Sequence, residues 1–302
     1  MSQRRYMVRR LGAVVVLAVV VAGSLRLGGV IFGADDTAAD SGGTVAPAVT
    51  SAITSAPTVV EQLAPPTTAA PVDTPPQVPT AADPAVVLIA GDSEAGTFGP
   101  YLETLLRETG VVRTELDYKV SSGLARPDYF DWPAHLQSTI PSIAPDIVVL
   151  TFGGNDAQGL SDLAGNFSIG QPTGDGDEEW RAEYGKRVGA VMEFLSADGR
   201  TLVWVGIPND DNPEVTARMK VQDEVVREQV AAHPGVIFID TWKRFSGIEG
   251  NWAEYVIDPR DAQGKDVRAD DGFHLNEAGA EILALDIAEV VRAELVARGA
   301  TL

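Results

Sequence analysis

The stretch AVVLIAGDS, residues 85–93, contains six consecutive apolar residues followed directly by a glycine, an acid and a serine. An apolar run that does not alternate with polar residues is typical of a strand buried on both faces, as in a parallel sheet. In open α/β sheets, ligands bind where such strands end. The stretch therefore predicts a strand over residues 85–90 and places Ser93 at the edge of the sheet that carries the chemistry.

The chain after this stretch continues to alternate short apolar runs with longer amphipathic segments. We expect four further strands over residues 113–120, 147–152, 201–207 and 236–240. The expected helices cover residues 101–108, 132–143, 178–196, 215–232 and 277–298, and the last one carries an apolar residue at every fourth position from Leu283 to Leu295. Five strand–helix units predict a three-layer α/β sandwich around a five-stranded parallel sheet, with right-handed crossovers.

Residues 1–34 have the composition of a membrane-targeting segment, because they contain no acid and an apolar run covers residues 11–25. Four arginines precede that run: Arg4, Arg5, Arg9 and Arg10. One interpretation is a signal peptide that is cleaved, which would release the protein. We favour the other, a membrane anchor over residues 11–33 in which the stem of Arg26 reaches toward the headgroups. Either way everything after residue 34 is exported, and the anchored protein would sit on the outer face of the cytoplasmic membrane.

The next segment, residues 35–84, consists largely of Thr, Ala, Pro, Val and Ser, and no Lys or Arg occurs between Arg26 and Arg107. Such a segment has too little large apolar side chain to offset the entropy cost of ordering it. We therefore interpret residues 35–84 as a disordered linker and residues 85–302 as the folded domain.

The chain is strongly acidic, with 23 basic and 43 acidic residues and a formal net charge of −20. Five of the basic residues lie within residues 1–34, so the remainder carries 18 basic and 43 acidic residues, a net charge of −25. This sign of charge opposes binding to nucleic acid and to anionic membrane surfaces. The chain has no cysteine, which excludes disulfides and thiolate chemistry.

Three polar blocks close the first three predicted strands: Gly91-Asp92-Ser93, Ser121-Ser122-Gly123 and Gly153-Gly154-Asn155-Asp156. A serine at a strand end is a candidate nucleophile, a glycine lets a backbone N–H approach a ligand, and an asparagine amide can donate to a developing oxyanion. Each block taken alone is equally compatible with ordinary cap or turn chemistry.

A fourth block, Asp271-Gly272-Phe273-His274, stands just before the last predicted helix. A neutral imidazole can take a proton from serine, and a carboxylate three residues earlier can hold the ring in the required tautomer and orientation. We expect the other two histidines, His135 and His233, to be solvated.

Together these blocks resemble the four sequence blocks that define the SGNH, or GDSL, hydrolases, over residues 86–296. The resemblance implies a flavodoxin-like sandwich with Ser93 as nucleophile, His274 as base and Asp271 as its orienting acid. It also implies an oxyanion hole formed by the N–H groups of Ser93 and Gly123 and the side chain of Asn155. Residues 122–124, 180–184, 204–208 and 268–274 further resemble a bacterial subfamily of exported SGNH domains without an assigned function, which implies no substrate.

One residue departs from the family's pattern. Glu94 stands where these hydrolases usually have an aliphatic residue, and an anion pointing into the site would oppose a developing oxyanion. We expect Glu94 to face solvent or to pair with an arginine. Asp92 and Asp156 are expected to hydrogen-bond loop backbone.

Several side chains near the blocks have two possible roles. Arg126 and Arg268 should lie near the pocket mouth, where they would bind a carboxylate or a hydroxyl-rich substrate, or else pair with nearby acids such as Asp128, Asp270 and Glu94. Three tryptophans either stack on sugar rings or pack in the core: Trp132, Trp180 and Trp252.

The function that these residues favour is an exported serine esterase that acts through an acyl-enzyme, without metal or cofactor. Its expected substrate is a small-molecule or carbohydrate ester, such as an acetyl group on cell-envelope carbohydrate. Two alternatives stay open. An O-acyltransferase would use the same residues and differ by excluding water from the acyl-enzyme. A non-catalytic surface module would keep the fold and bind glycan or protein.

Overall fold

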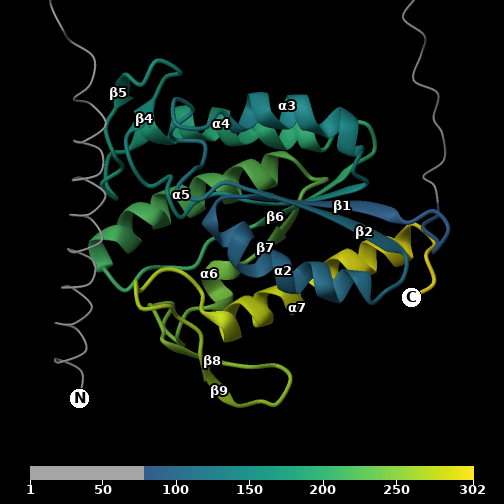
Figure 1. Ribbon diagram of the computed structural model, residues 1–302. Coiled ribbons are helices and arrows are strands. Elements are labelled where there is room, and N and C mark those ends of the chain that lie inside the picture. Colours follow the sequence, from purple (N-terminus) through teal and green to yellow (C-terminus); the bar gives the residue numbers. More distant parts are fainter. Residues whose placement is uncertain (1–77) are drawn as a thin grey trace, which may run out of the picture. The chain divides into compact units, whose positions relative to one another are not determined.

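The computed structural model describes residues 78–302, which are built around a five-stranded parallel sheet (Figure 1). Its strands are β1 (Ala85–Gly91), β2 (Val112–Tyr118), β3 (Ile147–Thr151), β6 (Thr201–Val205) and β7 (Ile237–Ile239). They lie in the order β2-β1-β3-β6-β7, and every pairing between them is parallel. This is the flavodoxin-like strand order, so the predicted fold is confirmed.

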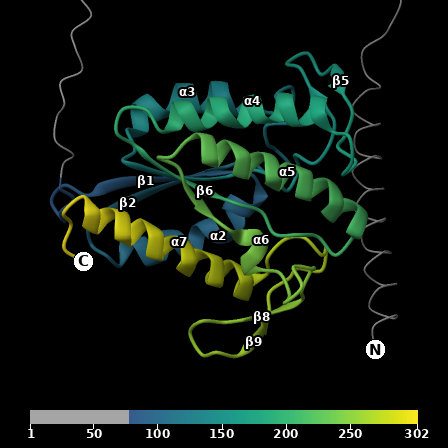
Figure 2. The same ribbon diagram turned by 180° about the vertical axis from the view of Figure 1, so that it is seen from behind.

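Helices cover both faces of the sheet (Figures 1 and 2). One face carries α2 (Ser93–Arg107) and α7 (Glu277–Ala297), and the other carries α3 (Trp132–Ile143), α4 (Glu178–Leu195) and α5 (Pro213–Ala232). In the central strand β1, Val87 and Ile89 pack in the core on the α2 and α7 side, whereas Leu88 and Ala90 pack in the core on the opposite side. Burial on both faces explains why this strand is apolar without alternation.

The predicted boundaries agree with the structure to within two residues, except for α2. The sequence predicted a helix over residues 101–108, but α2 begins at Ser93. Gly96, Gly99 and Pro100 lower the helix propensity of this segment, and tertiary packing outweighs that loss. A Cβ atom on Gly96 would lie 2.5 Å from the ring of Tyr118, so the glycine permits α2 to approach the end of β2 this closely.

Five short elements were not predicted. They are the pair β4 (Leu160–Ser161) and β5 (Phe167–Ile169), the pair β8 (Tyr255–Ile257) and β9 (Gly264–Asp266), and the helix α6 (Thr241–Arg244). Elements of two to four residues are too short to show a hydrophobic period. The views agree that β4 and β5 lie on the α3 and α4 side, and that β8 and β9 lie on the α7 side (Figures 1 and 2).

The predictions of a membrane segment over residues 1–34 and of a linker up to residue 77 lie outside the described residues. Residues 78–84, predicted as the end of the linker, contain a turn in which the N–H of Asp83 donates to the carbonyl of Thr80. Within residues 78–302, no helix is both long and apolar enough to cross a bilayer.

The fold makes a prediction about α7, whose inner side chains form much of the core against α2. Ile287 is fully buried, so Ile287→Ala should lower the free energy of unfolding by about 2–5 kcal/mol through lost burial and the cavity that remains. Urea denaturation followed by circular dichroism measures this. Val296 on the same helix is 56% exposed, and Val296→Ala should change the stability by less than about 0.5 kcal/mol. Equal losses in the two variants would contradict this assignment of the core.

Candidate active site

Ser93 and His274 come from opposite ends of the folded part of the chain and meet at the carboxyl edge of the sheet. Ser93 opens α2 directly after β1, His274 lies just before α7, and Ser93 Oγ lies 2.8 Å from His274 Nε2. On the other side of the ring, His274 Nδ1 lies 2.5 Å from Asp271 Oδ2. In the neutral ring the Nδ1–H donates to the carboxylate, which leaves Nε2 as the acceptor for the Ser93 proton. The three residues thus have the arrangement expected for a nucleophile, a base and an orienting acid.

The carboxylate of Asp271 is held firmly by its own loop. Asp271 Oδ1 accepts hydrogen bonds from the N–H groups of Phe273 and His274, both at 3.0 Å. Burial alone would raise the pKa of Asp271, but the hydrogen bond and charge of His274 outweigh burial and lower it. The same hydrogen bond raises the pKa of His274 to about 9, against the effect of burial. The site therefore stabilises the imidazolium that forms when His274 takes a proton.

Asp92 ties the first and third blocks together. Its side chain is fully buried and accepts three backbone hydrogen bonds, from the N–H of Glu94 at 3.0 Å, of Gly153 at 3.1 Å and of Gly154 at 3.2 Å. Burial raises the pKa of Asp92 to about 6, although these bonds oppose the rise. The predicted role of Asp92 in binding loop backbone is confirmed.

Asp156 ties the second and third blocks together. Its buried carboxylate accepts from the N–H of Leu124 at 2.8 Å, from the N–H of Ala125 at 2.9 Å and from the hydroxyl of Tyr184 at 2.8 Å. A Cβ atom on Gly123 would lie 2.1 Å from Asp156 Oδ1, so the loop can approach this carboxylate because residue 123 has no side chain. The predicted backbone-binding role of Asp156 is confirmed as well.

The three expected oxyanion donors lie on the loops that these two carboxylates connect. The Asn155 amide donates to the carbonyl of Ser122 at 3.2 Å, which places it beside Gly123 and leaves its second N–H group for a ligand. Among the described residues, the backbone N–H of Gly123 meets no acceptor. Ser93 occupies the first position of α2, where a backbone N–H has no partner within the helix. Their role in stabilising an oxyanion stays a prediction.

Arg268 does not lie at the pocket mouth, so the prediction that it binds substrate is wrong for this structure. Its side chain is buried, and all five of its N–H groups are satisfied by the carbonyls of Ala253, Asn209, Phe273 and Phe245 and by the side chain of Asn209. No acceptor is a carboxylate, so the ion-pair alternative is wrong too. Burial lowers the pKa of Arg268 to about 10, so it stays protonated at neutral pH. Its bond to Phe273 holds the segment that carries His274.

Arg126 follows the other alternative that the sequence left open, pairing with an acid. Its Nε and Nη2 atoms lie 2.8 and 2.7 Å from the two carboxylate oxygens of Asp128. The guanidinium also lies over the ring of Phe167 in β5, 4.7 Å from the ring centroid. A role for Arg126 in substrate binding stays a prediction.

The three tryptophans support loops of the site through their indole N–H groups. Trp132 donates to Ser122 Oγ and Trp180 to the carbonyl of Gln158, both at 2.8 Å, and both rings are buried, which confirms the packing alternative. Trp252 donates to the carbonyl of Gly272 at 2.7 Å and so supports the block that contains His274.

The sequence predicted that the other two histidines are solvated, but in the structure each of them has a hydrogen-bond partner. His135 Nε2 lies 2.7 Å from Asp117 Oδ2, and His233 Nδ1 lies 2.7 Å from the carbonyl oxygen of Gln229. Each ring therefore has a structural partner away from Ser93.

The prediction that Glu94 faces solvent or pairs with an arginine is wrong. Glu94 is 2% exposed, and neither of its carboxyl oxygens has a hydrogen-bond partner among the described residues. Burial is the main cause that raises the pKa of Glu94 to about 8. Arg268 cannot form an ion pair with it, because every donor of that guanidinium is already used.

Sequence reasoning missed Asn209, which is fully buried and holds Arg268 through both its carbonyl and its side chain. Asn209 comes shortly after β6, so it belongs to a further strand-end segment of the kind that contains Ser93 and Asn155. The strand-end rule would have found it if it had been applied to the fourth strand.

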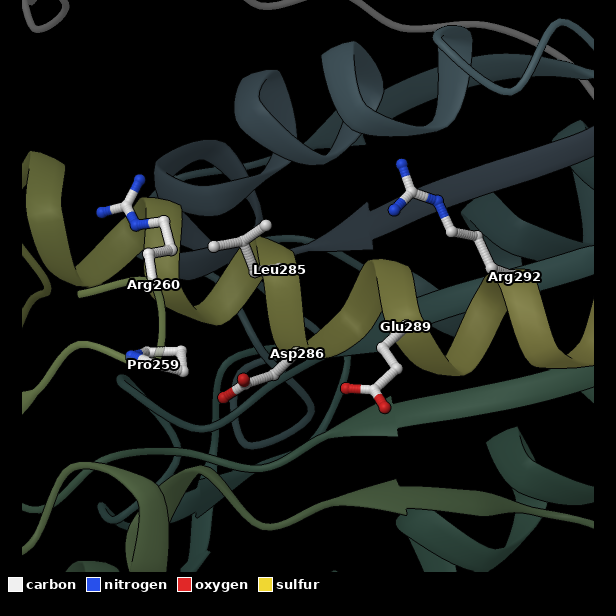
Figure 3. A pocket seen from close by; sticks show the side chains of 6 residues that line it. All are labelled: Pro259, Arg260, Leu285, Asp286, Glu289 and Arg292. Atoms are coloured by element: carbon white, nitrogen blue, oxygen red, sulfur yellow. The ribbon is translucent and has the colours of Figure 1, made fainter. Parts of the chain in front are cut away.

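A surface hollow beside α7 lies outside this site (Figure 3). It is lined by Pro259, Arg260, Leu285, Asp286, Glu289 and Arg292, and none of these belongs to the four blocks. Two of its charged groups are paired, Arg260 with Glu281 at 2.6 Å and Asp286 with Arg244 at 2.7 Å. We therefore locate the chemistry at Ser93 and not in this hollow.

Several solved structures are similar to this chain. The chain is similar to a solved GDSL-like lipase of Bacteroides thetaiotaomicron, with 12% identity, a TM-score of 0.48 and coverage of 72% of this chain and 92% of that chain. An acetylxylan esterase of Geobacillus stearothermophilus is 16% identical with a TM-score of 0.49, and the match covers 68% of this chain and 93% of that chain. An alpha/beta hydrolase from the metagenome of Lake Arreo, Spain, is 17% identical with a TM-score of 0.46, and the match covers 68% of this chain and 94% of that chain.

No curated protein sequence matches the chain. A family model described as "Protein of unknown function (DUF459)" matches residues 86–290 and thus spans all four blocks and more than half of the chain. The chain therefore belongs to the DUF459 family.

Proposed function

We propose that this protein is a serine esterase that hydrolyses small ester groups through an acyl-enzyme. Ser93 Oγ attacks the carbonyl carbon of the ester while His274 Nε2 takes the hydroxyl proton, and the oxyanion that forms is held by the Gly123 and Ser93 N–H groups and the Asn155 amide. The carbon–oxygen bond of the ester then breaks, and His274 gives its proton to the departing alcohol. Water attacks the acyl-Ser93 in the same way, which releases the acid and restores Ser93.

The observation that carries this proposal is the continuous contact from Ser93 through His274 to Asp271, at 2.8 and 2.5 Å. A binding module has no need for a serine aligned with an oriented imidazole. Hydrolysis is favoured over acyl transfer because the site is open to solvent. The side chains of His274 and Asp271 are 33% and 52% exposed, so water can reach an acyl group on Ser93.

For the substrate we propose a short acyl group on a carbohydrate. Phe273 packs so close to Gly154 that a Cβ atom there would lie 2.6 Å from its ring, which leaves little room for a long acyl chain beside Asn155. Tyr118 is 48% exposed and packs on Gly96, one turn after Ser93. A half-exposed tyrosine this close to the nucleophile suits a sugar ring, which has apolar faces and polar edges. We place the reaction outside the cytoplasmic membrane because of the composition of residues 1–34.

The nucleophile is tested with Ser93→Ala in the full-length chain. We expect hydrolysis of p-nitrophenyl acetate to fall by about 10³-fold or more, because the attacking oxygen is removed. A serine-reactive fluorophosphonate label, located by mass spectrometry, should attach to Ser93 in the wild type and vanish in the variant. Ser138→Ala, at an exposed serine on α3, is the matched control and should keep full activity. Turnover that survives in Ser93→Ala would refute this nucleophile.

The oxyanion donor is tested with Asn155→Ala. We expect kcat to fall by about 100-fold, because one donor to the developing negative charge is lost while the nucleophile and base remain. Fluorophosphonate labelling of Ser93 should persist at a lower rate. Asn166→Ala, at an exposed asparagine between β4 and β5, should have no effect on kcat. An unchanged kcat in Asn155→Ala would remove this residue from the proposed mechanism.

A further inference from the structure

The buried carboxyl group of Glu94 is a feature that the proposed reaction does not use. It belongs to the residue directly after the nucleophile, in the first turn of α2. The side chain is 2% exposed and both oxygens lack a hydrogen-bond partner among the described residues. A buried polar group without a partner costs free energy, so a hydrophobic residue would stabilise this position better than a glutamate does. Stability alone therefore gives no reason for a carboxyl group here.

The main electrostatic neighbours of Glu94 belong to the active site or to the residues that support it. They are His274, Asp92, Arg268 and Asp271. Arg268 is the permanent cation among them, and its five N–H groups point to other acceptors. The strongest electrostatic effect on Glu94 comes from His274, which is the one group in this set that changes charge during the proposed reaction. The hydrogen bond to Asp271 is the largest cause that raises the pKa of His274, and the charge of Glu94 is the next largest cause in that direction.

We propose that Glu94 is a positioning residue for this reaction, whose buried carboxyl group acts through space on His274 and controls how readily His274 takes and returns the Ser93 proton. The inference rests on the proposed esterase function and adds a second carboxyl group to the environment of the base. When Glu94 is ionised, it stabilises the imidazolium, so His274 holds its proton to a higher pH. When Glu94 is protonated, His274 behaves as a base that is oriented by Asp271 alone.

The two groups therefore titrate together. Loss of the proton from Glu94 makes the proton on His274 harder to remove, and the reverse holds as well, so the pair should lose its two protons in two separated steps. Two opposing effects on catalysis follow. An ionised Glu94 favours the imidazolium of the transition state, but it disfavours the oxyanion that forms on the carbonyl oxygen of the ester attached to Ser93. The residue thus shifts the pH range of activity upward instead of raising the rate at every pH.

The experiment is an NMR titration of the histidine rings in the full-length wild type and in Glu94→Gln, which keeps the shape of the side chain and removes its charge. The chain has three histidines, and a His274→Gln variant assigns the signal of His274. In the wild type the His274 signal should titrate in two steps. In Glu94→Gln it should titrate in one step, with a midpoint lower by on the order of one pH unit. Glu103→Gln on the outer part of α2, whose carboxylate accepts a hydrogen bond from Thr114, is the matched control and should leave the titration unchanged.

The acidic limb of kcat/KM for p-nitrophenyl acetate should move to lower pH by the same amount in Glu94→Gln. Because a buried amide can impair folding, Glu94→Met serves as a second variant and should give the same shift. A His274 midpoint that is unchanged in both folded variants would overturn the proposal. If the wild type neither turns over the ester nor labels at Ser93, the esterase function fails, and the histidine titration still decides separately whether Glu94 acts on His274.

Discussion

The buried carboxylate of Asp92 is the interaction on which the rest of the site depends. A fully buried anion is stable only when donors surround it, and here three backbone N–H groups from two segments do so. One donor lies in the first turn of α2 and two lie in the turn after β3. The nucleophile and the turn that carries Asn155 are therefore held together by the same side chain. In the same way, the carboxylate of Asp156 in that turn accepts hydrogen bonds from backbone N–H groups of the loop that contains Gly123.

The segment that carries His274 is held by a buried arginine instead of a buried carboxylate. Arg268 directs its five N–H groups at neutral oxygens, so it organises the segment before α7 without neutralising any acid. The core of the site then contains Asp92, Glu94 and Asp271 against His274 and Arg268. Carboxyl groups outnumber cations, and the cation that can lose a proton is His274. This balance explains why the environment favours the protonated imidazole, whereas ionisation of Glu94 is opposed mainly by burial.

Much of the architecture could be predicted from local patterns. The unbroken apolar run of β1 and the four-residue period of α7 reflect burial that repeats along one element, so sequence alone reveals them. The strand-end positions of Ser93 and Asn155 follow from the same runs. The start of α2 was predicted wrongly because the packing of Gly96 on Tyr118 joins two segments. The predictions for Arg268, Glu94 and His135 were wrong for a related reason, because their partners or their burial come from distant parts of the chain. Arg268, for example, donates to Asn209, which lies 59 residues away.

By itself, the sequence determined the five strands of the main sheet, the longer helices, their order, and the chemical groups at the strand ends, because hydrophobic period and strand-end chemistry are properties of neighbouring residues. Tertiary structure alone decided which of these groups are buried and which partners they find. Ser93 and His274 lie 181 positions apart and yet touch. The carboxyl group of Glu94, the next residue after Ser93, is buried and has no hydrogen-bond partner within residues 78–302. Burial and pairing are set by how distant segments pack, and no short stretch of sequence contains that information.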